Sequence, residues 1–165
     1  MSTSSTPNGQ NFEQKFTREM GKLESWLAPI FAKLPHIPSS ARETLVSLAP
    51  WLSLVFGILG LGALFSMGAI ASLFSPFILL AAGFAGILFF ANILIGLLAA
   101  VFEILAFKPL QEHRKKGWSL LFYGTVLSGA SSILGMLFMS HGGEGILGTL
   151  VGLWLLFEIR PAYKA

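Results

Sequence analysis

The stretch from Phe102 to Gly124, FEILAFKPLQEHRKKGWSLLFYG, decides how this chain is organised. It contains the only dense cluster of cations in the second half of the chain, Lys108, Arg114, Lys115 and Lys116. On each side lies an apolar block long enough to cross a bilayer twice. Residues 108–117 are therefore predicted to form a basic cytoplasmic loop between two transmembrane hairpins.

The composition is that of an integral membrane protein. Hydrophobic residues make up 54% of the 165 positions and charged residues only 12%, whereas soluble domains carry roughly 25% charged residues. The net charge of +3 comes from cations that flank the apolar blocks, and these do not form the basic stripe with interleaved aromatics that nucleic-acid binding requires. The predicted surroundings are a lipid bilayer, with no nucleic acid as partner.

The N-terminal region is predicted to have two parts. Residues 1–11 are rich in Ser, Thr, Asn, Gly and Pro and are expected to be a disordered tail. In residues 12–39, apolar side chains recur every three or four positions opposite charged ones, which predicts an amphipathic helix and a Pro-rich linker. Pro29 is expected to kink or divide the helix. We favour a position in the membrane headgroup region, and the alternative is docking on the bundle or on a partner.

The first transmembrane hairpin is predicted at residues 40–107. Ser40 and Glu43 fit a capping box, and the charge-free run 51–74 gives ~36 Å of helix. Ser75-Pro76 then predicts a turn and a new helix start, since Pro at the first helical position sacrifices no hydrogen bond. The resulting second span, residues 76–107, exceeds the bilayer and has to tilt, protrude or break, with Gly83, Gly86 and Asn92 as the expected break positions.

The second hairpin and a short cytoplasmic tail are predicted at residues 118–165. Residues 118–139 form an uncharged third span, and SHGGEG at 140–145 predicts a tight turn. The fourth span, residues 146–159, gives only ~21 Å of helix unless the glycines before it join the helix.

The cations fix the predicted orientation. All 11 Lys and Arg lie in the N-terminal segment, in the 108–117 loop or at the C-terminal end. By the positive-inside rule, both termini and this loop are cytoplasmic. Trp26, Trp51 and Trp118 fall at the same boundary and are expected to form an aromatic belt.

The two hairpins match each other in sequence. Five residues from Trp51 recur at identical offsets from Trp118, and a sixth position pairs Phe56 with Tyr123. FEI at 102–104 recurs at 157–159. The common order of these matches predicts a tandem duplication. Because each copy starts and ends in the cytoplasm, the copies are parallel and related by an axis along the membrane normal.

The segments 114–122 (RKKGWSLLF) and 155–164 (LLFEIRPAYK) resemble a group of small, uncharacterised bacterial multi-pass membrane proteins. In that group a basic-GW-x-LLF segment opens a hairpin that closes in LLF-x-IR. The resemblance implies a location in the bacterial cytoplasmic membrane, and it implies no activity.

Small and polar residues recur inside the spans. The favoured interpretation is close helix packing, and a polar conduit lined by the serines and Asn92 is the alternative. The residues predicted for packing are Gly124, Ser128 and Ser132 in the third span and Gly148 and Gly152 in the fourth.

Glu103 and Glu158 are the strongest functional candidates. An ionisable group in a transmembrane helix is costly, so its presence suggests a functional role. Both lie within two turns of the cytoplasmic cations, so we predict ion pairs with Arg114, Lys115 or Arg160. A cation or proton site is the alternative.

The function expected from these features is that of a structural or interaction subunit of the cytoplasmic membrane, self-associating or bound to another membrane protein. A small transporter or channel built from the two hairpins is the alternative. The sequence has no HExxH, GxSxG or phosphate-loop motif, so no enzyme is predicted. With no Cys and three isolated His, no metal site or cofactor is expected.

Overall fold

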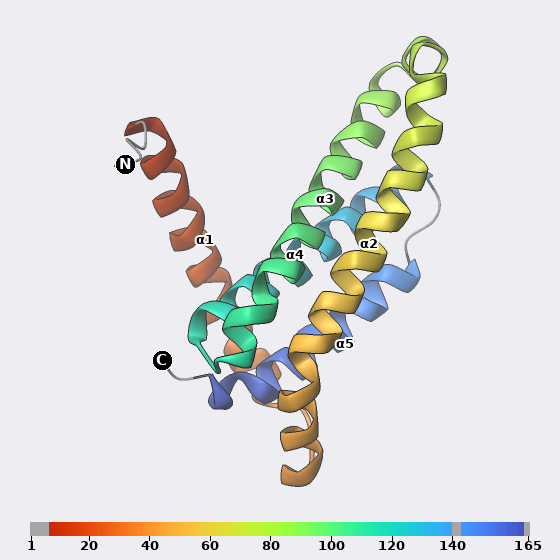
Figure 1. The fold of residues 1–165 in the computed structure, drawn as a ribbon. Coiled ribbons are helices and arrows are strands. Elements are labelled where there is room, and N and C mark those ends of the chain that lie inside the picture. The colour runs from red at the N-terminus through yellow and green to blue at the C-terminus, as the bar shows by residue number, and fades with distance from the viewer. Residues whose placement is uncertain (1–6, 140–142, 164–165) are drawn as a thin grey trace. The chain divides into compact units, whose positions relative to one another are not determined.

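A computed structural model describes residues 7–139 and 143–163, and every regular element in these ranges is helical. Helix α1 (Pro7–Phe31) belongs to a compact unit of its own, and a second unit begins at Ile37. The second unit holds α2 (Ser39–Ala82), α3 (Phe84–Gln111), α4 (Lys115–Met139), α5 (Gly143–Ile159) and a 3₁₀ turn, η1 (Arg160–Ala162). Figure 1 shows α2 and α3 side by side, extending beyond the ends of α4 and α5.

Four helices are long and apolar enough to cross a membrane. Within the described ranges the candidate spans are Ser39–Ser66, Gly86–Gln111, Lys115–Leu137 and Gly145–Ala162. The prediction of an all-helical protein is confirmed, and so is that of four long apolar helices that could span a membrane. Since α5 begins at Gly143, the fourth helix takes in part of the preceding glycine-rich segment, as its short apolar run required.

The turn between the first two spans lies at Gly83, so the turn predicted at Ser75-Pro76 is wrong. Helix α2 continues through Pro76 to Ala82. Gly83, one of the three expected break positions, ends the helix with a φ of 49°, a conformation that costs glycine little.

Helix α1 also differs from its prediction. It begins at Pro7, so residues 7–11, expected to be disordered, are helical, and residues 1–6 lie outside the described ranges. Pro29 lies inside the helix and does not divide it. Helix α2 begins at Ser39, one residue before the predicted cap.

The core of the second unit lies where α3 turns into α4. A Cβ on Gly117 would lie 2.5 Å from the Leu110 backbone nitrogen and 2.7 Å from the Pro109 carbonyl carbon. Only glycine therefore lets the first turn of α4 lie against the end of α3. Leu110, Trp118 and Phe122 are the largest fully buried described side chains.

Trp118 is a core residue, and its predicted place in a surface aromatic belt is wrong. Its Nε1 donates to the Leu156 carbonyl at 2.8 Å, and its ring stacks on Phe122 with centroids 5.4 Å apart. Trp26 and Trp51 are exposed, as belt residues would be.

Candidate functional site

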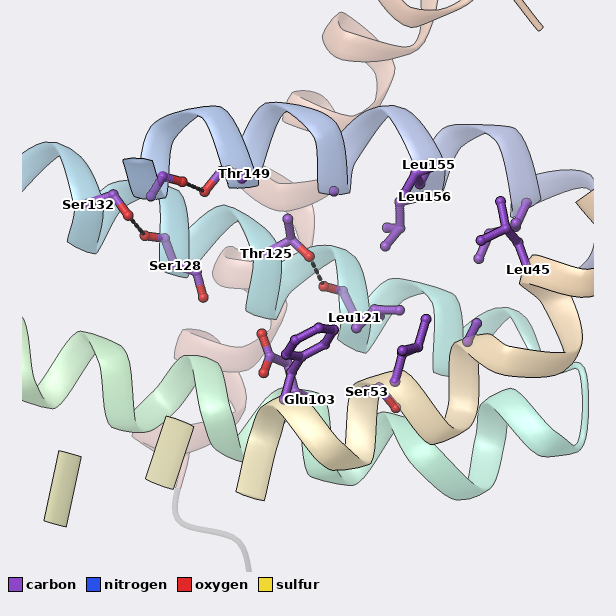
Figure 2. A pocket seen from close by; sticks show the side chains of 17 residues that line it. Leu45, Ser53, Glu103, Leu121, Thr125, Ser128, Ser132, Thr149, Leu155 and Leu156 are labelled. Carbon is purple, nitrogen blue, oxygen red and sulfur yellow. Dashed lines mark hydrogen bonds between the residues drawn. The ribbon is translucent and has the colours of Figure 1, made fainter. Parts of the chain in front are cut away.

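A cavity of about 400 Å³ lies between α2, α4 and α5, and Glu103 reaches it from α3. Figure 2 shows Ser132 and Thr149 at one end of the cavity, Leu45 at the other, and Glu103 between them. Apolar side chains make up most of the wall, among them Leu52, Phe56, Leu121, Leu155 and Leu156.

Glu103 is the only ionisable group among the described residues that line the cavity. Within the described ranges, its carboxylate makes no ion pair and no hydrogen bond. A Cβ on Gly124 would lie 3.1 Å from the Glu103 Cγ and 3.2 Å from the Ala99 carbonyl oxygen. Gly124 thus lies close against α3 and makes room for the Glu103 side chain. The ion pair predicted for Glu103 is not formed.

Glu158 does form an ion pair, but with a residue that the sequence reasoning missed. Its Oε2 lies 2.9 Å from Nη2 of Arg42, at the start of α2. The Glu158 side chain is 4% exposed and that of Arg42 is 36% exposed. Leu45, one turn after Arg42, lines the cavity. Ile159, which directly follows Glu158, lines it as well. The pair therefore joins α2 to α5 at one end of the cavity.

Two of the cations predicted to pair with the glutamates, Arg114 and Arg160, also contact other residues. Arg114 Nε lies 2.8 Å from Glu112 Oε2 on the exposed α3–α4 turn. Arg160 places its guanidinium carbon 5.4 Å from the centre of the Trp118 ring, an arrangement typical of a cation–π contact. The two glutamates, predicted to be equivalent, therefore have different electrostatic surroundings.

Tyr163 adds a second link at the Arg42 end of the cavity. Its hydroxyl donates to the Val46 carbonyl at 3.4 Å, and its ring stacks on His113 with centroids 5.9 Å apart. Burial raises the pKa of Tyr163 to about 12, so the phenol stays neutral and keeps its proton for this bond.

Four of the five hydroxyl groups among the described lining residues donate to their own helices, and Ser128 is the exception. Thr125 donates to the Leu121 carbonyl at 2.9 Å, Ser132 to the Ser128 carbonyl at 2.9 Å, and Thr149 to the Gly145 carbonyl at 2.8 Å. Ser53 does the same toward Pro50 at 2.7 Å. These bonds use the hydroxyl protons, so the groups offer the cavity oxygen lone pairs.

The remaining predicted residues divide between packing and the cavity wall. Asn92 accepts a 2.6 Å hydrogen bond from Ser131, which ties α3 to α4 away from the cavity lining. Gly152 packs on α4, where its Cβ would lie 3.5 Å from the Thr125 methyl carbon. A Cβ on Gly148 would meet no described atom within 4 Å, so Gly148 makes no close contact with the described part of the other helices, and it lines the cavity.

The described residues contain no group of three or more His, Cys, Asp or Glu side chains that could hold a metal ion. Comparison with known families, characterised proteins and solved structures finds no match. The function therefore has to be argued from the cavity itself.

Proposed function

We propose that this protein is a small transporter that binds a cation at Glu103. One observation carries the proposal: a carboxylate without a described partner lines a cavity between membrane-spanning helices. A charged group inside the bilayer is costly and is retained where it serves an ion or substrate pathway. The Arg42–Glu158 pair supports this assignment by contrast. The buried Glu158 has a cation beside it that stabilises its charge, whereas Glu103 has none among the described residues.

Cation flux into liposomes that contain the purified protein tests this proposal. Uptake of protons, of potassium and of a radiolabelled organic amine is measured for the wild type, Glu103→Gln and Glu112→Gln. Glu112 lies on the exposed turn and outside the cavity lining, which makes it the matched control. We expect Glu103→Gln to lower the uptake of the transported cation at least about tenfold, equivalent to about 1.4 kcal/mol. Wild-type uptake equal to that of empty liposomes for every cation would reject the transporter.

The proposed orientation places both termini and the α3–α4 turn in the cytoplasm of a bacterial cell, because all the cations gather there. The chain has no cysteine, so a single introduced thiol is an unambiguous reporter. Phe84→Cys, beside the Gly83 turn, is expected to react only with reagent added outside the cell. Glu112→Cys is expected to react only from the cytoplasmic side. Reaction of Phe84→Cys from the cytoplasmic side alone would refute this topology.

A structural or interaction subunit is the second candidate. The observation that favours it is α1, a separate unit whose Trp26 and Ile30 are exposed. We place this amphipathic helix in the membrane headgroup region. If α1 lies there, brominated lipid quenches the emission of Trp26. The quenched fraction of the total tryptophan emission is then larger in the wild type than in Trp26→Phe. If the quenched fraction is the same in both proteins, α1 docks on protein instead.

The tandem repeat remains a proposal about the origin of the two hairpins. Its support is the set of matched residues that follow Trp51 and Trp118. The matched glycines, however, make different contacts. Gly57 packs on α3, its partner in the first hairpin, whereas Gly124 of the second hairpin packs on α3 of the first. In related sequences, a duplication requires the two hairpins to align with each other better than with unrelated membrane hairpins.

A further inference from the structure

We infer that the cavity binds an organic cation with an apolar body, which enters sideways from the bilayer. This inference rests on the proposed function and names its substrate class. It follows from the lining chemistry, from the donors that the cavity lacks, and from the exposure of part of its wall.

The lining chemistry selects one positive charge on an apolar molecule. Leucines and Phe56 supply most of the wall, and Glu103 supplies the single charge among the described lining residues. A cavity of about 400 Å³ falls in the range of about 300–1,000 Å³ typical of small-molecule sites. Phe56 also brings an aromatic ring to the site, and aromatic faces attract organic cations.

The same lining disfavours anions and bare inorganic cations. No Lys, Arg or His is among the described lining residues, and the hydroxyls of Ser53, Thr125, Ser132 and Thr149 already donate to backbone carbonyls. An anion would find no counter-charge and few donors there. Hard divalent cations require about six or more oxygen ligands, and this cavity offers one carboxylate and scattered hydroxyls among leucines.

The entry route follows from the exposure of two lining residues on α2. Leu52 is 41% exposed and Phe56 is 59% exposed, although both line the cavity. Both lie within the candidate span Ser39–Ser66. If this helix crosses the bilayer, its exposed apolar surface faces lipid. The wall of the cavity thus continues onto the lipid-facing surface of α2. A cation that partitions into the bilayer through its apolar body reaches Glu103 by this side.

Binding of tetraphenylphosphonium, a lipophilic cation, to the purified full chain in detergent tests this inference. Equilibrium dialysis compares the wild type with Glu103→Gln and with the control Glu112→Gln, and the neutral triphenylphosphine oxide is the uncharged comparison. We expect saturable binding of the cation by the wild type and the control, and at least about tenfold weaker binding by Glu103→Gln. Glu103→Asp keeps the charge and should bind the cation more tightly than Glu103→Gln. That difference would show that the loss of charge, and not misfolding, weakens binding in Glu103→Gln.

Two results would overturn the inference: equal affinity of the wild type and Glu103→Gln for the cation, or equal affinity of the wild type for the cation and the neutral compound. Absence of tetraphenylphosphonium binding together with Glu103-dependent proton or potassium flux would reject the organic cation and leave the transporter standing. Glu103-dependent binding without flux of any tested cation would reject transport and support the ligand class.

Discussion

Replacing Arg42 by Ala is expected to lower the free energy of unfolding by about 3 kcal/mol. The substitution removes the guanidinium that lies 2.9 Å from Glu158, whose side chain is only 4% exposed. Removing one partner of a buried ion pair leaves the other charge in a medium of low polarity, which costs about 3–5 kcal/mol. Because Arg42 is 36% exposed, water screens part of the interaction, and we expect the lower end of that range.

Equilibrium unfolding of the purified protein in mixed micelles, followed by circular dichroism, measures this loss. The matched control is Arg114→Ala, whose partner Glu112 lies 2.8 Å away in a pair with side chains 63% and 39% exposed. Such a surface pair contributes less than about 1 kcal/mol. The combined change of Arg42 to Met and Glu158 to Leu should restore most of the lost stability, since no buried charge remains. Equal losses for Arg42→Ala and Arg114→Ala would show that the Arg42 pair has no special role.

The sequence was sufficient to predict the four apolar helices. The loop predicted at residues 108–117 is wrong in extent, because α3 continues to Gln111 and α4 begins at Lys115, which leaves a turn of three residues. Length and absence of charge determine whether a helix can cross a bilayer, and both properties are local. The position of the first turn is less local. Ser75-Pro76 carries the residues of a helix start, yet α2 passes through them and ends at Gly83. The stronger signal was the excessive length predicted for residues 76–107, which pointed to a break at Gly83, Gly86 or Asn92.

The electrostatics of the site could be predicted only in part. Both glutamates follow a Phe and precede an Ile, and both stand near cations in the sequence. The partner of Glu158, however, is 116 positions away on α2, and only the packing of α2 beside α5 brings Arg42 to it. No local pattern singles out Arg42, because it stands beside Glu43 at the start of α2. Trp118 was misassigned because its place near the end of an apolar run indicates its depth in the membrane and does not indicate which side of the helix faces lipid.

Glu103 is expected to react with dicyclohexylcarbodiimide in the membrane, and Glu158 is expected not to react. This apolar reagent dissolves in the bilayer and adds to protonated carboxyl groups that it reaches from the lipid side, and the carboxyl proton moves to a carbodiimide nitrogen. Glu103 lines a cavity whose wall includes the exposed Phe56, and within the described ranges no cation neutralises it. Glu158 is 4% exposed and paired with Arg42. The expected contrast is nearly complete modification of one glutamate and almost none of the other.

Mass spectrometry of proteolytic peptides from protein treated in liposomes locates the adduct and tests most directly whether Glu103 is an accessible carboxylate inside the bundle. The account predicts an adduct on the peptide that contains Glu103, its loss in Glu103→Gln, and an unmodified peptide around Glu158. An adduct on Glu158 with Glu103 unmodified would contradict the account.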